Sequence, residues 1–257
     1  MLDRIINYRY KDYIFFASRT TLKSRYSSMY LGYVWWFLDP LVFMTIFIFV
    51  YQIVFDRSMP NYSTFVLMGW IVWRWISGSI TQCTYSISSR TGILEQISAP
   101  KHIFPMVSLL VETLLFTAAL TMIPLAMMFD GTAFTWHIIE FIPVTIVTFI
   151  TLYGFGLIMS HIGTIVADFK QVITYVLRLL FYLSPIFYEI QILPDYILPY
   201  YHLNPVSVIV ESYRACFIYG QSPDYFWLGY VLLLGIILIP LGLYLTKKYD
   251  KTYAKIK

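Results

Sequence analysis

Residues 226–245 read FWLGYVLLLGIILIPLGLYL, a run without a charged side chain. A helix that crosses the hydrocarbon core of a bilayer needs roughly 20 mostly apolar residues, so this stretch is long enough to span a membrane. Five earlier stretches share its apolar character, although the fifth of the six is short, and the six are 34–55, 63–86, 104–129, 138–164, 172–187 and 226–245. The sequence therefore predicts an all-α polytopic membrane protein with six transmembrane helices.

The composition of the chain favours lipid over water as its solvent. Hydrophobic residues make up 59% of the 257 residues and charged residues only 12%, whereas a soluble domain carries about 25% charged residues. The net charge of +4 is small and scattered, so we expect no nucleic-acid partner. We divide the chain into a cytoplasmic interfacial segment at 1–33, one transmembrane domain at 34–245 and a basic tail at 246–257.

Lysine and arginine fall in every second gap between the predicted helices, and this distribution orients the chain. Six of them precede the first span and five lie in the tail, whereas the alternate gaps contain only Arg57 and Arg214. Cytoplasmic loops carry an excess of these residues, so both termini should be cytoplasmic. The first 33 residues contain no continuous apolar run of the kind found in a cleavable signal peptide. The first span is therefore the expected insertion signal.

Residues 12–30 have the pattern of an amphipathic helix. Ile14, Ser18 and Leu22 share one face at helical spacing, and Arg25 interrupts that face. A helix of this kind lies in the membrane interface with its cations near anionic headgroups. It is either an anchor that fixes topology or a moving gate helix that contacts a partner or a substrate headgroup. The residues predicted for the second role are Arg19, Lys23, Arg25 and Tyr26.

The chain from 179 to 220 is apolar and aromatic but is cut by four prolines, Pro185, Pro194, Pro199 and Pro205. The pieces between the prolines are too short to cross a bilayer. Irregular backbone at membrane depth is tolerated only where it is buried in protein or lines a cavity. We therefore expect outer re-entrant half-helices in this region. The alternative is a plain external loop with a hydrophobic surface.

Two charged residues lie inside predicted spans, Arg74 in 63–86 and Glu112 in 104–129. A charged side chain at such a position costs about 2.5–3.5 kcal/mol on insertion scales and usually faces the protein interior. Arg74 and Glu112 are therefore candidates for pairing with each other and for contact with a substrate. The four histidines are isolated in the sequence, so we predict no metal site.

The entry to the first span carries a distinctive set of motifs. Basic and aromatic residues at 23–26 precede a Leu-Gly pair at 31–32, a Trp pair at 35–36 and the triplet Leu38-Asp39-Pro40. A second set is found further along, and it consists of YLSPIFY at 182–188 and LNP at 203–205. Together these motifs resemble those of type-2 ABC exporter permeases. More narrowly, they resemble permeases that export lipid-linked polysaccharides such as O antigen, capsule and teichoic acid.

The resemblance implies a permease half that pairs as a homodimer in the bacterial cytoplasmic (inner) membrane and works with two copies of a cytoplasmic ABC ATPase. The substrate would be a lipid-linked glycan moved outward, and membrane lipids would surround the dimer. The chain contains no Gly-rich phosphate loop, so we expect no enzyme activity and no cofactor on it. ATP and Mg would be bound by the partner subunit.

The resemblance also gives a role to the cytoplasmic gap at 90–101, which by itself looks like an ordinary connector. This position resembles that of the coupling helix in the family. The coupling helix fits a groove on the ATPase and passes the motion of the ATPase to the spans. The residues concerned are Gly92, Ile93, Leu94, Glu95, Gln96 and Ile97.

Aromatic residues are unusually common, with 23 Tyr, 20 Phe and 7 Trp. This is more than two interfacial belts need, and a conduit for a repetitive glycan would use aromatic faces to stack on sugar rings. The residues that we expect to line the path are Trp35, Trp36, Tyr51, Tyr182, Phe187 and Tyr188. Two other functions stay open, a type-2 permease for a drug or small lipid and a membrane enzyme that processes glycolipids. The enzyme would need a clustered catalytic set, and the sequence offers none.

Overall fold

The computed structural model describes residues 8–27, 30, 32–90, 100–194 and 196–253, and within these residues it contains helices and no strand. The α-helices are α1 (Tyr8–Ser27), α2 (Trp35–Ile48), α3 (Tyr62–Tyr85), α5 (Ile103–Leu120), α6 (Met122–Asp130), α7 (Phe141–Ile165), α8 (Phe169–Leu183), α9 (Leu198–Leu203), α10 (Pro205–Arg214), α11 (Tyr225–Lys248) and α12 (Asp250–Tyr253). Shorter or tighter turns are η2 (Gly32–Val34), η3 (Phe49–Val54), η4 (Ser88–Arg90), η5 (Trp136–Glu140), η6 (Ile190–Ile192) and η7 (Ala215–Tyr219). The predicted all-α class is confirmed.

Four helical runs in the described part of the chain are long and apolar enough to cross a membrane, and they are Trp35–Val54, Ile103–Asp130, Trp136–Ile165 and Tyr225–Lys248. They coincide with four of the six predicted spans. The second and fifth predicted spans are also helical, as α3 and α8. However, α3 carries many polar and aromatic side chains, and α8 has only 15 residues. The multi-pass character of the chain therefore rests on four helices, and the count of six stays a prediction.

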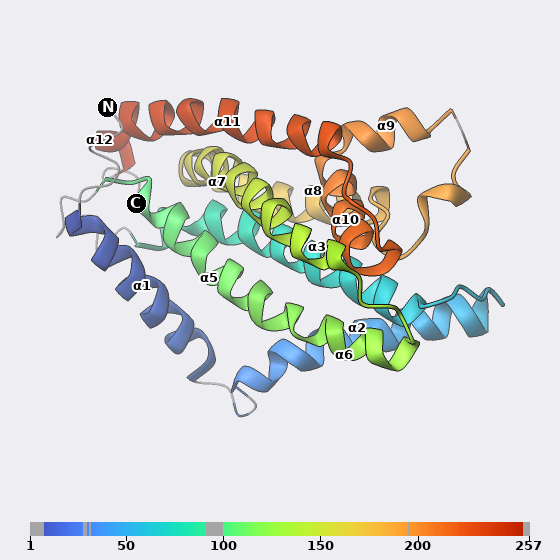
Figure 1. Cartoon of the computed structure of the whole chain (residues 1–257). Coiled ribbons are helices and arrows are strands. Elements are labelled where there is room, and N and C mark those ends of the chain that lie inside the picture. Colours follow the sequence, from blue (N-terminus) through green and yellow to red (C-terminus); the bar gives the residue numbers. More distant parts are fainter. Residues whose placement is uncertain (1–7, 28–29, 31, 91–99, 195, 254–257) are drawn as a thin grey trace.

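Helix α3 is the central helix of the bundle, since it packs against α2, α5, α7 and α10 (Figure 1). Every residue from 64 to 73 is buried. Neighbouring helices rather than lipid surround this part of α3. A helix packed in this way needs no continuous apolar surface of its own, which explains why its composition is less apolar than that of the other predicted spans.

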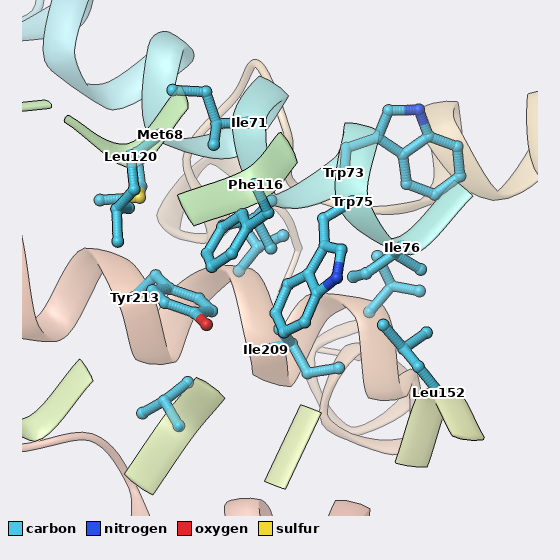
Figure 2. Packing of buried hydrophobic residues seen from close by; sticks show 14 of the residues in the cluster. Met68, Ile71, Trp73, Trp75, Ile76, Phe116, Leu120, Leu152, Ile209 and Tyr213 are labelled. Atoms are coloured by element: carbon cyan, nitrogen blue, oxygen red, sulfur yellow. The ribbon is translucent and has the colours of Figure 1, made fainter. Parts of the chain in front are cut away.

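Aromatic rings from three helices meet in the core (Figure 2). The indole of Trp75 stacks on Phe116 of α5 with 4.2 Å between ring centroids, and Phe116 meets Tyr213 of α10 edge-on at 5.7 Å. The Nε1–H of Trp75 also donates to Oγ1 of Thr113 at 3.1 Å. Aromatic pairs of this kind contribute about 0.5–1.5 kcal/mol beyond the area that they bury, so the cluster fixes α3 against α5 and α10.

Helix α1 runs beside α5 (Figure 1). The face predicted to be apolar is turned toward the protein, where Ser18 is buried and Ile14 is half-buried, while the neighbouring Phe15 and Phe16 are exposed. Arg25 also points inward, so its interruption of the apolar pattern marks a contact with another side chain. The placement of α1 in the membrane interface stays a prediction.

After α8 the chain breaks into short helices at its prolines, as the sequence predicts. Helix α8 ends at Leu183, just before Pro185, and Pro205 is the first residue of α10. Asn204 caps α10, because its side chain accepts from the backbone N–H of Val206 at 3.0 Å. Proline suits the first position of a helix, where an N–H would have no intrahelical partner. The depth of these pieces in a membrane, and therefore their re-entrant character, stays a prediction.

Candidate functional site

A cavity of about 690 Å³ lies between α1, α2, α3 and α5. It brings together five residues that the sequence assigned to three different groups, and they are Arg25, Trp35, Trp36, Arg74 and Glu112. Ligand pockets typically have volumes of about 300–1,000 Å³, so this cavity can accommodate part of a large substrate. Its wall also includes Asp39, Ser77, Thr81, Gln82 and Phe116.

Glu112 forms an ion pair with Arg25 of α1. Nη1 of Arg25 lies 2.6 Å from Oε1 of Glu112, whose side chain is only 6% exposed, against 27% for Arg25. Gly78 of α3 makes room for the carboxylate, because a Cβ at that position would lie 2.7 Å from Oε2. A buried charge of this kind requires a close partner of opposite sign. The pair Arg74–Glu112 that the sequence suggested does not form, because the predicted gate helix supplies the partner of Glu112 instead.

Arg74 forms a looser ion pair with Asp39 of α2, in which Nε and Oδ2 are 3.5 Å apart. The side chains of Arg74 and Asp39 are 59% and 38% exposed. The neighbouring Trp73 and Trp75 are buried in the core, whereas Arg74 is turned toward the cavity. Exposed pairs contribute only about 0–1 kcal/mol, so the guanidinium group of Arg74 can exchange this partner for another anion at little cost.

Asp39 is a site residue that the sequence reasoning did not single out. It appears there only as part of the motif Leu38-Asp39-Pro40, yet it is also a charged residue inside the predicted span 34–55. The energetic argument that draws attention to Arg74 and Glu112 applies equally to Asp39. That argument is the signal by which the sequence could have revealed it.

The cavity combines two guanidinium groups, two carboxylates and the indole groups of Trp35 and Trp36. Guanidinium groups bind phosphates and carboxylates through forked hydrogen bonds, and an indole presents an apolar face together with an N–H donor. Hydroxyl and amide groups on the same wall add neutral hydrogen-bonding capacity. This lining suits an anionic ligand that also carries sugar rings. Among the described residues, no three His, Cys, Asp or Glu side chains gather as a metal site requires.

Three of the residues predicted for the substrate path, Tyr182, Phe187 and Tyr188, lie where α8 ends rather than in the cavity wall. Tyr182 is 62% exposed, and its ring meets that of Phe187 edge-on at 6.3 Å between centroids. The hydroxyl groups of Tyr188 and Tyr201 are hydrogen-bonded to each other. Burial raises the pKa of Tyr188 above its ordinary value. We call these three residues the aromatic patch.

A row of rings on α2 and α3 adjoins the aromatic patch. Phe187 stacks on Phe47 at 5.1 Å between centroids, Phe47 lies 6.2 Å from Phe43, and Phe43 stacks on Trp70. Tyr51, the remaining predicted path residue, stacks on a tyrosine of α3 at 4.2 Å. The sequence reasoning missed Phe43, Phe47 and Trp70. The recurrence of aromatic residues at 43, 47 and 51, which share one helix face, is the signal that indicates such a row.

The remaining predicted site residues are not brought to the cavity by the described structure. Arg19 and Lys23 are exposed on α1, and Tyr26 belongs to its last turn. The six residues predicted as the coupling helix, 92–97, lie outside the described residues. Of the three predicted gate-helix residues whose side chains the structure describes, Arg19, Lys23 and Arg25, it places Arg25 in the cavity wall.

Comparison with known proteins identifies relatives of similar length. The chain is 27% identical over 249 residues to the O-antigen export system permease protein RfbA of Klebsiella pneumoniae, with 95% of each chain covered. It is 23% identical over 235 residues to the polysialic acid transport protein KpsM of Escherichia coli, with 90% of each chain covered. It is 21% identical over 238 residues to the capsule polysaccharide export inner-membrane protein CtrC of Neisseria meningitidis, covering 89% of this chain and 87% of that protein.

Residues 13–218 match the family of ABC-2 type transporters. Proteins of this family are membrane subunits of transporters rather than enzymes, and a separate subunit hydrolyses ATP. The matched region contains both ion pairs of the cavity and the whole aromatic patch. Because the match extends over well more than half of the sequence, the chain belongs to the ABC-2 type transporter family.

Proposed function

We propose that the chain is the permease of an ATP-driven exporter that moves a lipid-linked polysaccharide out across the bacterial cytoplasmic membrane. The observation that carries this proposal is the cavity, in which the exposed Arg74 shares a wall with Trp35 and Trp36. A lipid-linked glycan presents phosphate oxygens beside sugar rings, and the cavity offers partners for both. Relatives named for the export of O antigen, polysialic acid and capsule polysaccharide support this substrate class. Teichoic acid stays a prediction from the motifs alone.

We further propose six crossings with both termini cytoplasmic, in which α3 and α8 are the second and fifth spans. In Figure 1 the start of α1 and the C-terminal helix α12 lie at the same end of the helices as the start of α5. Asp250 of α12 supports this placement, since its Oδ1 lies 3.9 Å from Nζ of Lys101 just before α5. Under this topology the cavity lies toward the cytoplasmic side, and the pieces between α8 and α11 form an outer gate.

Thiol labelling in intact cells tests this topology. Both native cysteines are buried, so Ser58→Cys and Glu95→Cys can each be read against a low background. We expect an impermeant reagent added outside to label position 58 and to leave position 95 unlabelled until the membrane is opened. Labelling of position 95 from outside would contradict the six-crossing arrangement.

The assembly that we propose is a homodimer with two ABC ATPase subunits, which bind ATP and Mg. Apolar side chains that are exposed on the chain support lateral contacts, and they include Val42 and Ile46 on α2 and Tyr175 and Leu179 on α8. Such surfaces meet either lipid or another membrane subunit. The cytoplasmic residues 92–97 carry the contact with the ATPase in this proposal.

Deleting the gene in its host and restoring it with variants tests the substrate class. Deletion should remove polymer from the cell surface and leave lipid-linked polymer inside, and the parental chain should restore export. Arg74→Gln should lower export at least tenfold, because the cavity loses its exposed cation, whereas Arg57→Gln at an exposed outer position should not. Unchanged surface polymer with altered drug sensitivity would instead support a permease for drugs or small lipids.

A further inference from the structure

Arg214 is the last residue of α10, and its side chain is fully enclosed, although the sequence places it in an outer gap. Its Nη1 donates to the carbonyl oxygen of Pro185 at 2.5 Å, and its Nη2 donates to those of Ile186 at 2.7 Å and Phe65 at 3.4 Å. Nη1 also lies 2.7 Å from Oε1 of Glu211, which is on α10 as well. One side chain therefore joins α10, α3 and the break that follows α8.

The break approaches α3 closely at this contact. Cζ of Arg214 lies 3.4 Å from the centroid of the Phe65 ring. A Cβ on Gly69 of α3 would lie 2.3 Å from the carbonyl oxygen of Ile186 and 2.8 Å from Nη2 of Arg214. Position 69 therefore requires glycine, because the backbone of the break occupies the space of a side chain. We call residues 184–187 the outer turn.

Two further hydrogen bonds hold the outer turn. Nδ2 of Asn204 donates to Oγ of Ser184 at 3.0 Å, and the hydroxyl of Tyr62 donates to the carbonyl oxygen of Phe187 at 3.0 Å. Ser184 is fully enclosed, whereas Tyr182 just before the turn is 62% exposed. Residues before and within α3 and α10 therefore hold the turn inside the protein, whereas the side chain of Tyr182 before it is exposed.

The chemistry of arginine accounts for this arrangement. Carbonyl groups of irregular backbone within a membrane protein have no water to bind, so they need donors from the protein. A guanidinium has five N–H donors in a planar fork and keeps its charge when buried. It can serve several carbonyl groups at once while Glu211 balances its charge. A lysine ammonium carries its three N–H donors on one nitrogen, so it cannot reach the separate carbonyl groups in the same way.

We propose that Arg214 is a latch that holds the outer turn against α3 and so sets the closed position of the outer gate. Arg214 is a positioning residue, because its enclosed side chain contacts backbone rather than substrate. The outer turn can move away from α3 only if the hydrogen bonds from Arg214 to Pro185 and Ile186 break together. In this proposal the closed and displaced positions of the turn are therefore two separate states and not a continuous range. The identity of the substrate that passes the turn rests on the proposed exporter function, whereas the latch itself does not depend on that identity.

Thiol labelling at position 186 in spheroplasts tests the latch. Ile186→Cys places a thiol in the enclosed turn and keeps its backbone carbonyl, and it is made together with Cys83→Ala and Cys216→Ala in a chain coexpressed with its ATPase. Arg214→Lys should raise the rate of labelling by an impermeant reagent at least tenfold at equal membrane levels. Arg57→Lys makes the same change at an exposed outer position and should leave the rate unchanged.

Dependence on the ATPase separates a latch from simple structural support. With Arg214 in place, labelling of position 186 should be faster with an active ATPase than with an inactive one, because ATP hydrolysis by the partner drives the turn open. With Arg214→Lys it should be fast with both. Slow labelling in both Arg214→Lys and Arg214→Gln chains at normal membrane levels would overturn the proposal. Fast labelling of the chain that retains Arg214 beside an inactive ATPase would overturn it too.

Gly69→Ala gives a second variant, in case Arg214→Lys does not accumulate in the membrane. The added Cβ displaces both the carbonyl of Ile186 and the guanidinium, so labelling of position 186 should rise as well. Gly229→Ala is the matched control, since a Cβ there meets nothing within 4 Å. Unchanged labelling in Gly69→Ala would count against the latch. The labelling needs no polymer, so a failure to export polysaccharide would overturn the proposed function and leave the latch result standing.

Discussion

Arginine has two contrasting surroundings in this protein, the cavity bordered by α1, α2, α3 and α5 and the outer turn after α8. In the cavity Arg74 is 59% exposed and pairs with the side chain of Asp39. At the outer turn Arg214 is fully enclosed and donates to the backbone carbonyl groups of Pro185 and Ile186. A side-chain partner at the surface can be exchanged for a ligand, whereas backbone partners belong to the fold. The contrast separates an arginine suited to binding a ligand, Arg74, from one suited to holding a backbone segment in place, Arg214.

The pair Arg25–Glu112 lies between these two extremes. Its partners are side chains, as at Arg74, but Glu112 is nearly as enclosed as Arg214, with only 6% of its side chain exposed. The pair also joins α1 to α5 across 87 residues of sequence. Whether a pair acts as a holding or a binding contact should therefore follow from its burial, and this can be measured.

Removal of Glu112 should have the largest effect on stability. Glu112→Leu takes away the carboxylate that lies 2.6 Å from Arg25. Breaking a fully buried pair lowers the free energy of unfolding by about 3–5 kcal/mol, and we expect the lower end of that range here because the remaining Arg25 is 27% exposed. Unfolding of the purified protein in detergent measures this loss. The double variant Arg25→Leu and Glu112→Leu should recover most of it. If Glu112→Leu is as stable as the parent, burial does not decide the role of these pairs.

Gly78→Ala should have an intermediate effect. Its Cβ would lie 2.7 Å from Oε2 of Glu112, and overpacking of this kind costs about 1–3 kcal/mol. In a chain that already carries Glu112→Ala the same change should be nearly neutral, because the two sites share one contact. Gly229→Ala is the control without a nearby atom. An equal loss in both backgrounds would show that Gly78 is needed for some reason other than the carboxylate.

The sequence predicted the lipid-length helices well because hydropathy reflects the solvent directly. The predicted span 34–55 and the helical run Trp35–Val54 agree closely, as do 226–245 and Tyr225–Lys248. Hydropathy was less decisive for α3, whose surroundings are other helices. Its buried residues between 64 and 73 depend on contacts with segments far away in the sequence. Local composition cannot reveal such contacts.

The same limit applies to the site. Arg25, Arg74 and Glu112 were recognisable because a charge in an apolar setting requires an explanation, but their partners were not, since pairing depends on how helices distant in sequence pack. Arg214 was the least visible, because an arginine in an outer gap looks like a solvated residue. It is enclosed only because α10 packs against α3 and Arg214 contacts the outer turn.

The smallest effect on stability is expected at Arg74 and Asp39, although export should depend on Arg74. Each of Arg74→Gln and Asp39→Asn should alter the free energy of unfolding by less than about 1 kcal/mol, because the pair is exposed. Export should nevertheless fall with Arg74→Gln and persist with Asp39→Asn, since only the cation is needed for an anionic ligand.

Exchanging the two charges makes this prediction sharper. The double variant Asp39→Arg and Arg74→Asp keeps an ion pair between α2 and α3 but moves its cation from one helix to the other. We expect normal stability and membrane levels with export still impaired, because a ligand bound by Arg74 meets a carboxylate at position 74. Export at the parental level in this variant would mean that the ion pair itself, and not the position of its arginine, is what the transporter needs. Arg74 would then be a holding arginine like Arg214, and the contrast between the cavity and the outer turn would reduce to a difference in exposure.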